Sequence, residues 1–486
     1  MKNFYITTTL PYVNSEPHLG FAKEIINADI IARFKRQLGF NVFFNTGTDE
    51  HGQKIYQKAI EMGIDPLEYC SSFSNKFIKL KDTLNLSFNN FIRTTDDDHI
   101  KAVQNFWKKC LDNGDIYKKD YQVKYCVGCE MEKTDSELEN GICPLHPNQK
   151  IELIEEENYF FKFSKYQNKL LEFYKKNPNF VKPKGKFNEI ISFVEGGLND
   201  FSISRVKEKM PWGITVPDDD SQVMYVWFDA LVNYISCLGW PDNLDEFNKF
   251  WPGLQVCGKD NLRPQTAMWP AMLMSAGLNI SEQVLIFGFL TVNGQKISKS
   301  SGNTVDPVEL VKKYGADIVR YYLAKEISTF EDGDFSYEKL ERLYTSDLVN
   351  GLGNLVARVS NLIEKSDSDI ILEKIKYREG IPLIEKKNDF FNLFQEKMKD
   401  YKLNEAISVI ASKIKETDEY LSQKAPWKME EGLEKKEILK KSAENILNIA
   451  LLSYPFIPES ANKIIAQFNA DKIIKGEILF PKLLIN

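Results

Sequence analysis

The sequence lacks a long apolar run, an excess of basic charge and a rich supply of cysteine or histidine. Its most apolar C-terminal stretch, residues 446–457, is too short to span a bilayer and contains Pro455, so we expect no membrane segment. The N-terminus has no apolar signal-peptide core, and seven cysteines is an odd number. Both features favour reduced thiols and a cytoplasmic location over a disulfide framework. The net charge of −6 excludes a basic nucleic-acid coat protein.

The residues that are present are typical of a large folded protein. Hydrophobic residues make up 43% and aromatic residues 12% of the 486 positions, which is enough for sizeable cores and excludes a disordered chain. At about 150 residues per domain, this length predicts roughly three domains. We find no internal repeat and no flexible linker rich in glycine or serine.

The first fifty residues predict a strand–helix–strand unit. A β-rich run at 4–10 ends at Pro11, a helical stretch runs to Leu38 and stops at Gly39, and residues 42–44 form a short buried strand. Such a unit implies parallel strands joined by a right-handed crossover, with ligands beyond the carboxyl ends of the strands. We expect the site there, near residues 9–12 and 46–51.

The rest of the chain changes character twice. Residues 115–215 carry four Cys/His positions and clusters of Glu, which indicates an inserted module. Strands are expected at 224–228, 254–257 and 284–287. From about residue 340 the pattern is helical. One helix, ending at Pro426, has a face of apolar residues at spacings of four, three and four: Leu403, Ile407, Ile410 and Ile414. A second helix is expected at 433–452, before Pro455.

A pair of short Cys/His motifs predicts a metal site in the insertion. The spacing is Cys126-x2-Cys129-x13-Cys143-x2-His146, so that two tight turns can present four ligands to a tetrahedral zinc ion. Four protein ligands close the coordination shell, which favours one structural zinc over a catalytic one. The alternative is a set of scattered buried thiols.

Two segments are suited to phosphate. Pro17-His18-Leu19-Gly20 precedes the first helix, whose N-terminal N–H groups and dipole attract anions. The polar loop at 294–303 carries Lys296 and Lys299 and can close over a triphosphate. Taken alone, each segment has a plainer interpretation, a capping histidine in the first and a solvated loop in the second.

Together these segments and several others resemble the methionyl-tRNA synthetase family of class I synthetases. The matching motifs occur in the family's order and spacing: TLPY at 9–12, PHLG at 17–20, TGTDEHG at 46–52, YVWFDA at 225–230, GKD at 258–260 and KISKS at 296–300. The resemblance extends to Asn354-x3-Arg358 and Pro426-Trp427, so it covers most of the chain.

The resemblance implies the activation of L-methionine with ATP and Mg²⁺, followed by transfer of methionine to tRNA(Met), including the initiator tRNA. The implied catalytic residues are His18, Lys296 and Lys299. The implied ATP-binding residues are His18, Gly20, Gly258, Asp260 and Lys299. The implied methionine-binding residues are Leu10, Tyr12, Asp49, Trp227, Ala230, Leu231, Tyr234 and Gln265. An aromatic cavity suits an unbranched thioether. Asn354, Arg358 and Trp427 would bind the anticodon, with Trp427 stacking on a base.

The resemblance also implies the architecture. We expect an α/β fold in which a doubly wound, Rossmann-like parallel sheet forms the catalytic domain, with a zinc-knuckle insertion and an all-α anticodon-binding domain. The expected boundaries are 1–115 and 221–325 for the catalytic halves, 116–220 for the insertion, 326–345 for a connecting segment and 346–486 for the helical domain. No appended dimerisation module follows, so we expect a monomer.

Two residues depart from the family's pattern. Phe21 stands where the first signature ends in a second histidine and cannot donate to a phosphate; Lys23 is a candidate replacement. Gln265 stands at a position that is commonly histidine and keeps both a donor and an acceptor. Two alternatives therefore stay open: a class I synthetase for cysteine or a branched aliphatic amino acid, and a catalytically silent tRNA-binding protein.

Overall fold

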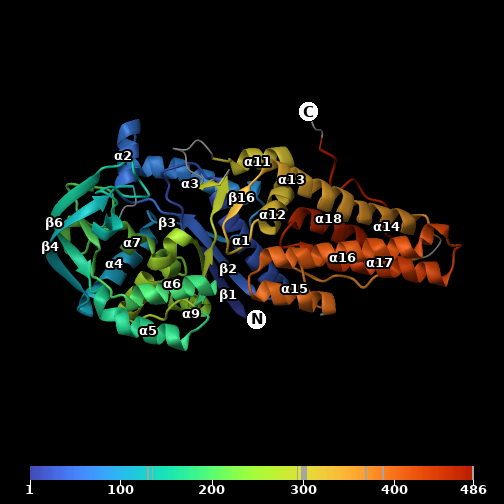
Figure 1. The fold of residues 1–486 in the computed structure, drawn as a ribbon. Coiled ribbons are helices and arrows are strands. Elements are labelled where there is room, and N and C mark those ends of the chain that lie inside the picture. Colours follow the sequence, from blue (N-terminus) through green and yellow to red (C-terminus); the bar gives the residue numbers. More distant parts are fainter. Residues whose placement is uncertain are drawn as a thin grey trace.

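The computed structural model describes residues 1–128, 131–133, 135–292, 294–296, 304–366, 369–385 and 388–483. The molecule is elongated: a β-rich insertion lies at one end, the main sheet lies in the middle and a bundle of long helices projects from the other end (Figure 1). Among these residues, no helix is both long and apolar enough to cross a membrane.

The central sheet has six parallel strands in the order β3-β2-β1-β12-β13-β7. Their bounds are β1 Asn3–Thr8, β2 Asn41–Thr48, β3 Asn90–Arg93, β7 Val181–Lys182, β12 Leu254–Gly258 and β13 Gln283–Phe287. Ile6 of β1 pairs with Phe44 on one side and with Leu254 on the other. Helix α1, Leu19–Gln37, makes the first crossover, so the predicted strand–helix–strand unit is confirmed.

Both faces of this sheet are covered. Successive residues of each strand point to opposite faces, and accordingly Ile6, Val256 and Leu285 belong to one apolar core while Tyr5, Cys257 and Ile286 belong to another. The first core includes α1 and α12 (Ala316–Lys325), and the second includes α4 (Asp97–Asp112) and α10 (Trp269–Ala276). Two cores on two faces make the fold doubly wound, as expected.

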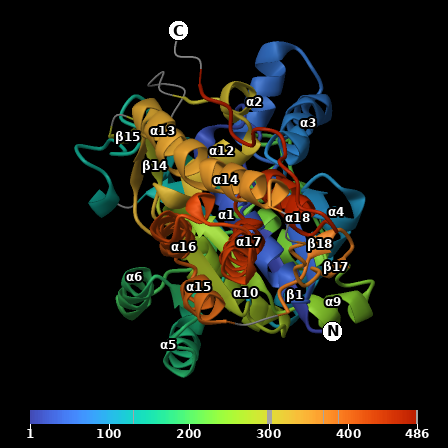
Figure 2. The ribbon, with the colours of Figure 1, turned by 90° about the vertical axis from the view of Figure 1, so that its right-hand side faces the viewer.

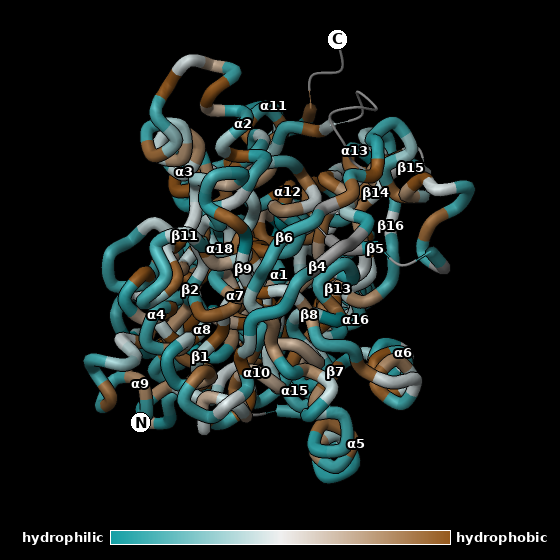
Figure 3. The backbone as a smooth tube through the Cα atoms, turned by 90° about the vertical axis from the view of Figure 1, so that its left-hand side faces the viewer, coloured by the Kyte–Doolittle hydropathy of each residue, from teal (hydrophilic) through white to brown (hydrophobic). Residues whose placement is uncertain are grey.

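The insertion consists mainly of antiparallel strands. Its sheet has the order β5-β4-β6-β8, dominated by the long pair β4 (Ile116–Cys126) and β6 (Ile151–Phe161), with β5 at Met131–Lys133 and β8 at Phe201–Ser202. β4 and β6 cross the face seen in Figure 3 and are mostly hydrophilic there. A smaller sheet joins β9 (Ser204–Val206), β10 (Thr215–Val216) and β11 (Asp219–Met224). The helices α5, Gln167–Lys176, and α6, Lys184–Glu195, follow β6.

Two features differ from the sequence-based expectation. The strand expected at 224–228 is wrong, because β11 ends at Met224 and helix α7 occupies Val226–Ala230. A short apolar run that is largely buried looks the same in a strand and in a helix, so its pattern could not separate them. In addition, β7 pairs with β13 in the central sheet, although its residues lie within the range expected for the insertion.

The C-terminal helices form a bundle that Figure 2 shows from its far end. A continuous helical stretch comprises α13 (Tyr337–Leu343), a π-helical segment at Tyr344–Gly353 and α14 (Asn354–Glu364), and so crosses the boundary expected at 346. The others are α15 Asp389–Lys399, α16 Leu403–Lys424, α17 Leu433–Ser453 and α18 Pro458–Phe468. Helix α11, Pro307–Tyr314, lies outside the bundle and packs against α12. The helix predicted from apolar spacing, α16, and the helix expected at 433–452, α17, are both confirmed. Three short strands, β14 Leu290–Val292, β15 Gln295–Lys296 and β16 Gly333–Phe335, link the sheet to this bundle.

Candidate active site

A cavity of about 640 Å³ opens at the carboxyl ends of the central strands. Its wall contains twelve of the residues that the sequence singled out: Leu10, Tyr12, His18, Gly20, Asp49, Trp227, Ala230, Leu231, Tyr234, Gly258, Asp260 and Gln265. They come from segments up to about 250 residues apart. The parallel order of β2, β1 and β12 brings the segments after these strands to one edge, and the residues at 227–234, which follow β11 of the smaller sheet, complete the wall.

One end of the cavity is formed by the N-terminus of α1. His18 is the N-cap of this helix, and its Nδ1 accepts a hydrogen bond from Gly20 N at 3.1 Å. A Cβ on Gly20 would lie 3.0 Å from the His18 ring, so a larger residue at this position would crowd the imidazole. Val305 O accepts from Leu19 N at 3.0 Å, which ties the chain after the lysine-rich loop to the start of α1.

The lysine-rich loop itself is only partly described. The backbone of Lys296 pairs with Thr291 between β15 and β14. Lys299, like the rest of 297–303, lies outside the described residues. The strand pair β14–β15 therefore fixes where this loop begins, and Val305 fixes where it returns to α1.

Phe21 and Lys23, the two residues discussed at the first signature, have different surroundings. The Phe21 ring packs edge-on against Phe77, with 5.2 Å between the ring centroids. Lys23 lines the cavity, but its Nζ donates to Gly288 O at 2.7 Å, and burial lowers its pKa to about 8. The contact of Lys23 is thus with the backbone just after β13, and with a pKa of about 8 its ammonium stays mostly protonated at pH 7.

Glu24 is a cavity residue that the sequence analysis missed. Its Oε1 atom is buried and has no hydrogen-bond partner among the described residues. Burial of the carboxyl and the nearby Asp260 carboxylate raise the pKa of Glu24 to about 8. At pH 7 this side chain therefore carries a proton and can act as a donor next to Asp260.

The other end of the cavity is lined by aromatic and amide groups. Gln265 Nε2 donates to Tyr234 OH at 2.6 Å and to Thr9 Oγ1 at 3.1 Å, while Gln265 Oε1 has no partner among the described residues. Trp227 Nε1 is also buried without a described partner. Backbone bonds between Asp49 and residues 11 and 13 hold the Asp49 carboxylate at the rim of the cavity.

A buried Asp–His cluster holds helix α7, which carries Trp227 and Ala230. Asp229 accepts from His51 Nδ1 at 2.6 Å and from His99 Nε2 at 2.8 Å, and Ser236 Oγ lies 2.9 Å from His99 Nδ1. Burial opposes ionisation of Asp229, but the two imidazoles hold its pKa below the usual range. His51 and Asp229 lie inside the motifs at 46–52 and 225–230, so the sequence offered a signal for these two residues. His99 lies in no motif, and the sequence offered no signal for it.

The Cys/His cluster lies beside the same cavity. His146 Nδ1 is 3.9 Å from Cys126 Sγ and 4.0 Å from Cys143 Sγ, and the three donor atoms lie within 4.8 Å of one another. Cys129 lies outside the described residues. A Cβ on Gly128 would come within 2.3 Å of the His146 ring. Lys54 Nζ donates to Gly128 O at 2.7 Å, which attaches this turn to α2 (Gln53–Met62) at the cavity's edge.

A second group of predicted residues gathers at the far end of the helical bundle. Asn354 and Arg358 lie one turn apart on α14, and the Arg358 guanidinium lies 5.6 Å from the centre of the Trp427 ring. Arg358 also donates to Asp418. Trp427 follows Pro426 in a short helical turn and is 46% exposed, so it is not a core plug between helices.

The doubly wound parallel sheet, with its cavity beyond the carboxyl ends of the strands, is the arrangement found in nucleotide-binding α/β proteins. A family model described as tRNA synthetases class I (M) matches residues 4–152 and 132–360. A model of the anticodon binding domain of methionyl tRNA ligase matches residues 378–476. The chain belongs to the methionyl-tRNA synthetase family of class I.

Individual relatives agree along the whole chain. The methionine–tRNA ligase of Thermotoga maritima is 42% identical over 99% of this chain and 80% of its own length, and that of Rickettsia felis is 41% identical over 100% and 95%. The Mycobacterium tuberculosis methionyl-tRNA synthetase bound by methionyl-adenylate superposes with a TM-score of 0.90 at 34% identity, covering 99% of this chain and 100% of that one.

Proposed function

We propose that this chain is a methionine–tRNA ligase that converts L-methionine and ATP to methionyl-adenylate and then charges tRNA(Met), the initiator included. The observation that carries this proposal is that one cavity at the sheet edge is lined by nine residues of the quoted motifs, together with Leu231, Tyr234 and Gln265. The family match supports the methionine enzyme over the cysteine or branched-aliphatic alternative, and the exchange assay below separates it from the silent tRNA-binding alternative.

In the first step the methionine carboxylate attacks the α-phosphate of ATP in line, and pyrophosphate leaves. No side chain needs to become covalently attached, so the protein contributes positioning and electrostatic stabilisation. At the N-terminus of α1 the helix dipole favours phosphate. Because His18 Nδ1 accepts from Gly20 N, the donor that His18 contributes to phosphate would be its Nε2–H, and Lys296 and Lys299 supply positive charge from the loop. Mg²⁺ bound with ATP would neutralise further phosphate charge.

The adenosine and methionine sites occupy opposite sides of the cavity. Gly258 and Asp260 would hold the ATP sugar and adenine region, and the close fit between them supports this, since a Cβ on Gly258 would lie 2.8 Å from Asp260 Oδ1. The Asp49 carboxylate would pair with the methionine ammonium. The thioether would enter the side lined by Leu10, Tyr12, Trp227, Ala230, Leu231, Tyr234 and Gln265, where soft aromatic contacts suit sulfur.

In the second step a terminal ribose hydroxyl of the tRNA attacks the acyl carbonyl of the adenylate, and AMP leaves. The exposed Trp427 ring beside Arg358 supports recognition of the anticodon at the other end of the molecule. An aromatic face and a guanidinium suit an unstacked base and its edges, and Asn354 adds donors and acceptors on the same helix face.

We infer one structural zinc held by Cys126, Cys129, Cys143 and His146. The donor set of thiols and imidazole fits zinc, and the separations of 3.9 and 4.0 Å fit donors that share one tetrahedral ion. When bound, the ion would hold together the turns that border the cavity. The described cysteines are all free of disulfides, which supports a reducing, cytoplasmic setting.

ATP–pyrophosphate exchange, run with Mg²⁺ and each of the twenty amino acids in turn, tests the proposal. We expect exchange with methionine alone, and loss of exchange in Asp49→Asn, while the matched surface variant Asp245→Asn keeps it. Exchange with another amino acid would assign the chain to a sister synthetase. Absence of exchange from folded protein would favour the silent tRNA-binding alternative.

A further inference from the structure

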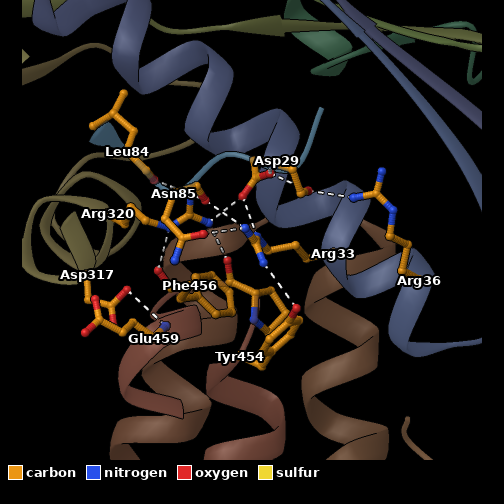
Figure 4. Close-up of polar contacts among 12 residues, drawn as sticks. Asp29, Arg33, Arg36, Leu84, Asn85, Asp317, Arg320, Tyr454, Phe456 and Glu459 are labelled. Atoms are coloured by element: carbon orange, nitrogen blue, oxygen red, sulfur yellow. Dashed lines mark hydrogen bonds and ion pairs between the residues drawn. The ribbon is translucent and has the colours of Figure 1, made fainter. Parts of the chain in front are cut away.

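A buried cluster of charged residues, none of which lines the cavity, joins the catalytic domain to the helical bundle (Figure 4). It contains Asp29 and Arg33 from α1, Asn85 from the segment after α3 (Pro66–Thr83), Arg320 from α12 and the 454–456 turn between α17 and α18. We call this set the Arg320 hub. No motif in the sequence pointed to it.

Arg320 is fully buried, and all five of its N–H groups have acceptors. Two bonds of 2.7 Å run from Nη2, one to Asp29 Oδ2 and one to Pro455 O. Nε donates to Phe456 O at 3.1 Å. Nη1 donates to Leu84 O at 3.1 Å and to Asn85 O at 3.2 Å. One rigid guanidinium therefore contacts α1, the segment after α3 and the α17–α18 turn at once.

Arg33 repeats this bridging from the α1 side. It donates to Asp29 Oδ2 at 2.7 Å, to Asn85 O at 2.7 Å and to the hydroxyl of Tyr454 at 3.2 Å. The other oxygen of Asp29 accepts from the backbone N–H and the hydroxyl of Ser87, each at 2.6 Å. Despite its burial, these cations and donors lower the pKa of Asp29 to about 2.

The hub also reaches the first turn of α18. Asp317, three residues before Arg320 on α12, accepts from Ser460 N at 2.6 Å. Two guanidinium groups and two carboxyl groups thus meet at this one junction. Directional bonds to buried charges hold one orientation of the packed elements, whereas apolar contacts alone tolerate sliding.

The hub lies between the two sites of the enzyme. Helix α1 begins at His18 in the cavity, and α17 runs from the hub to the region of Trp427. The 21 residues of α17 make a lever of about 30 Å, so a tilt of about 5° at the 454–456 turn would move its far end by about 3 Å. Such a displacement is comparable with the length of a hydrogen bond to a base.

We propose that the Arg320 hub is a positioning joint that sets the angle of the anticodon-binding helices against α1 and so serves tRNA charging rather than adenylate formation. This inference rests on the proposed function. Arg320 touches neither site among the described contacts, so its effect is exerted through the orientation of the bundle.

The test compares wild type with Arg320→Lys, which keeps the charge but loses the planar five-donor fork. Tyr454→Phe removes only the bond from Arg33, and it provides a second variant if Arg320→Lys does not fold. Arg36→Lys is the control, since Arg36 donates to Ser87 from the same helix and makes no described bond to the turn. Methionine-dependent pyrophosphate exchange, melting temperature and charging of tRNAs with a CAU or an altered anticodon are measured.

For Arg320→Lys we expect exchange within about twofold of wild type, while kcat/KM for the CAU tRNA falls at least tenfold. Charging of the altered tRNA should change little, because that tRNA gains least from the anticodon contact. For Tyr454→Phe we expect unchanged exchange and a two- to threefold fall in kcat/KM for the CAU tRNA. For Arg36→Lys we expect both exchange and CAU charging to stay at the wild-type level. Parallel loss of exchange and of charging of both tRNAs, or normal CAU charging by either folded hub variant, would overturn the inference. Failure of wild type to exchange would instead refute the proposed function.

Discussion

Replacing Asp229 with Asn should damage methionine binding from beneath the pocket. Asp229 is buried on α7 and accepts from His51 at 2.6 Å and from His99 at 2.8 Å. Asparagine keeps the volume but removes the charge and turns a donor toward one imidazole. Breaking a buried charged pair costs about 3–5 kcal/mol, and each charge-assisted bond contributes about 1.5–3 kcal/mol.

Part of this free-energy cost should lower the stability of the folded protein, and part should appear as weaker methionine binding because α7 is displaced. If about 1.5–3 kcal/mol appears as displacement of the helix that carries Trp227 and Ala230, KM for methionine should rise roughly ten- to hundredfold. KM for ATP should change less than threefold, because Gly258 and Asp260 lie on a different element, after β12. The assay is pyrophosphate exchange with each substrate varied at saturation of the other, beside a melting curve. Equal increases in both KM values, or an unchanged KM for methionine in folded protein, would refute this reasoning.

Three further predictions follow from other parts of the molecule. Since the pKa of Glu24 is about 8, the folded state keeps a proton that the unfolded state loses above pH 4.5, so stability falls as pH rises between these values. Glu24→Gln should therefore gain melting temperature relative to wild type from pH 5.5 to 8, and a constant difference would contradict the assignment. Cys143→Ser should lower the zinc content measured by atomic absorption from one per chain to well below one, with a lower melting temperature, whereas zinc equal to wild type would remove Cys143 from the ligand set. Trp427→Ala should leave pyrophosphate exchange unchanged and reduce tRNA charging at least tenfold, and an equal fall in both would show that Trp427 has no anticodon role.

The sequence predicted those parts of the fold that local patterns determine. The turn after Pro11, the stop at Gly39 and the apolar spacing of α16 are signals within a few residues, and each corresponds to an element boundary or a buried face in the structure. The cavity wall was predictable for a different reason. Many of its residues lie in short motifs that follow β1, β2 and β12, and a parallel sheet must bring such strand ends to one edge.

The missed features depend on distant contacts. The run at 224–228 is buried as a helix because α7 is held by Asp229, whose partners lie 178 and 130 residues away. The strand β7 is two residues long and owes its place in the sheet to its pairing with β13, not to its own pattern. Nothing within these segments carries that information.

Helix α1 explains why buried charges can be so hard to predict. It lies between the sheet, α12 and the 454–456 turn, so even its polar residues Asn27, Asp29, Arg33 and Gln37 are buried, and it shows no polar stripe. In a sequence, polar residues on a helix usually indicate the face that is exposed to solvent. The burial of Asp29, Arg33 and Gln37 is tolerable because other elements supply partners: Arg320 bonds to Asp29, Asn85 O accepts from Arg33, and Leu451 O accepts from Gln37 Nε2 at 2.9 Å. The partners come from the helical bundle as well as the catalytic domain, so the same helix that begins at the phosphate end of the cavity is completed only when the two domains are joined.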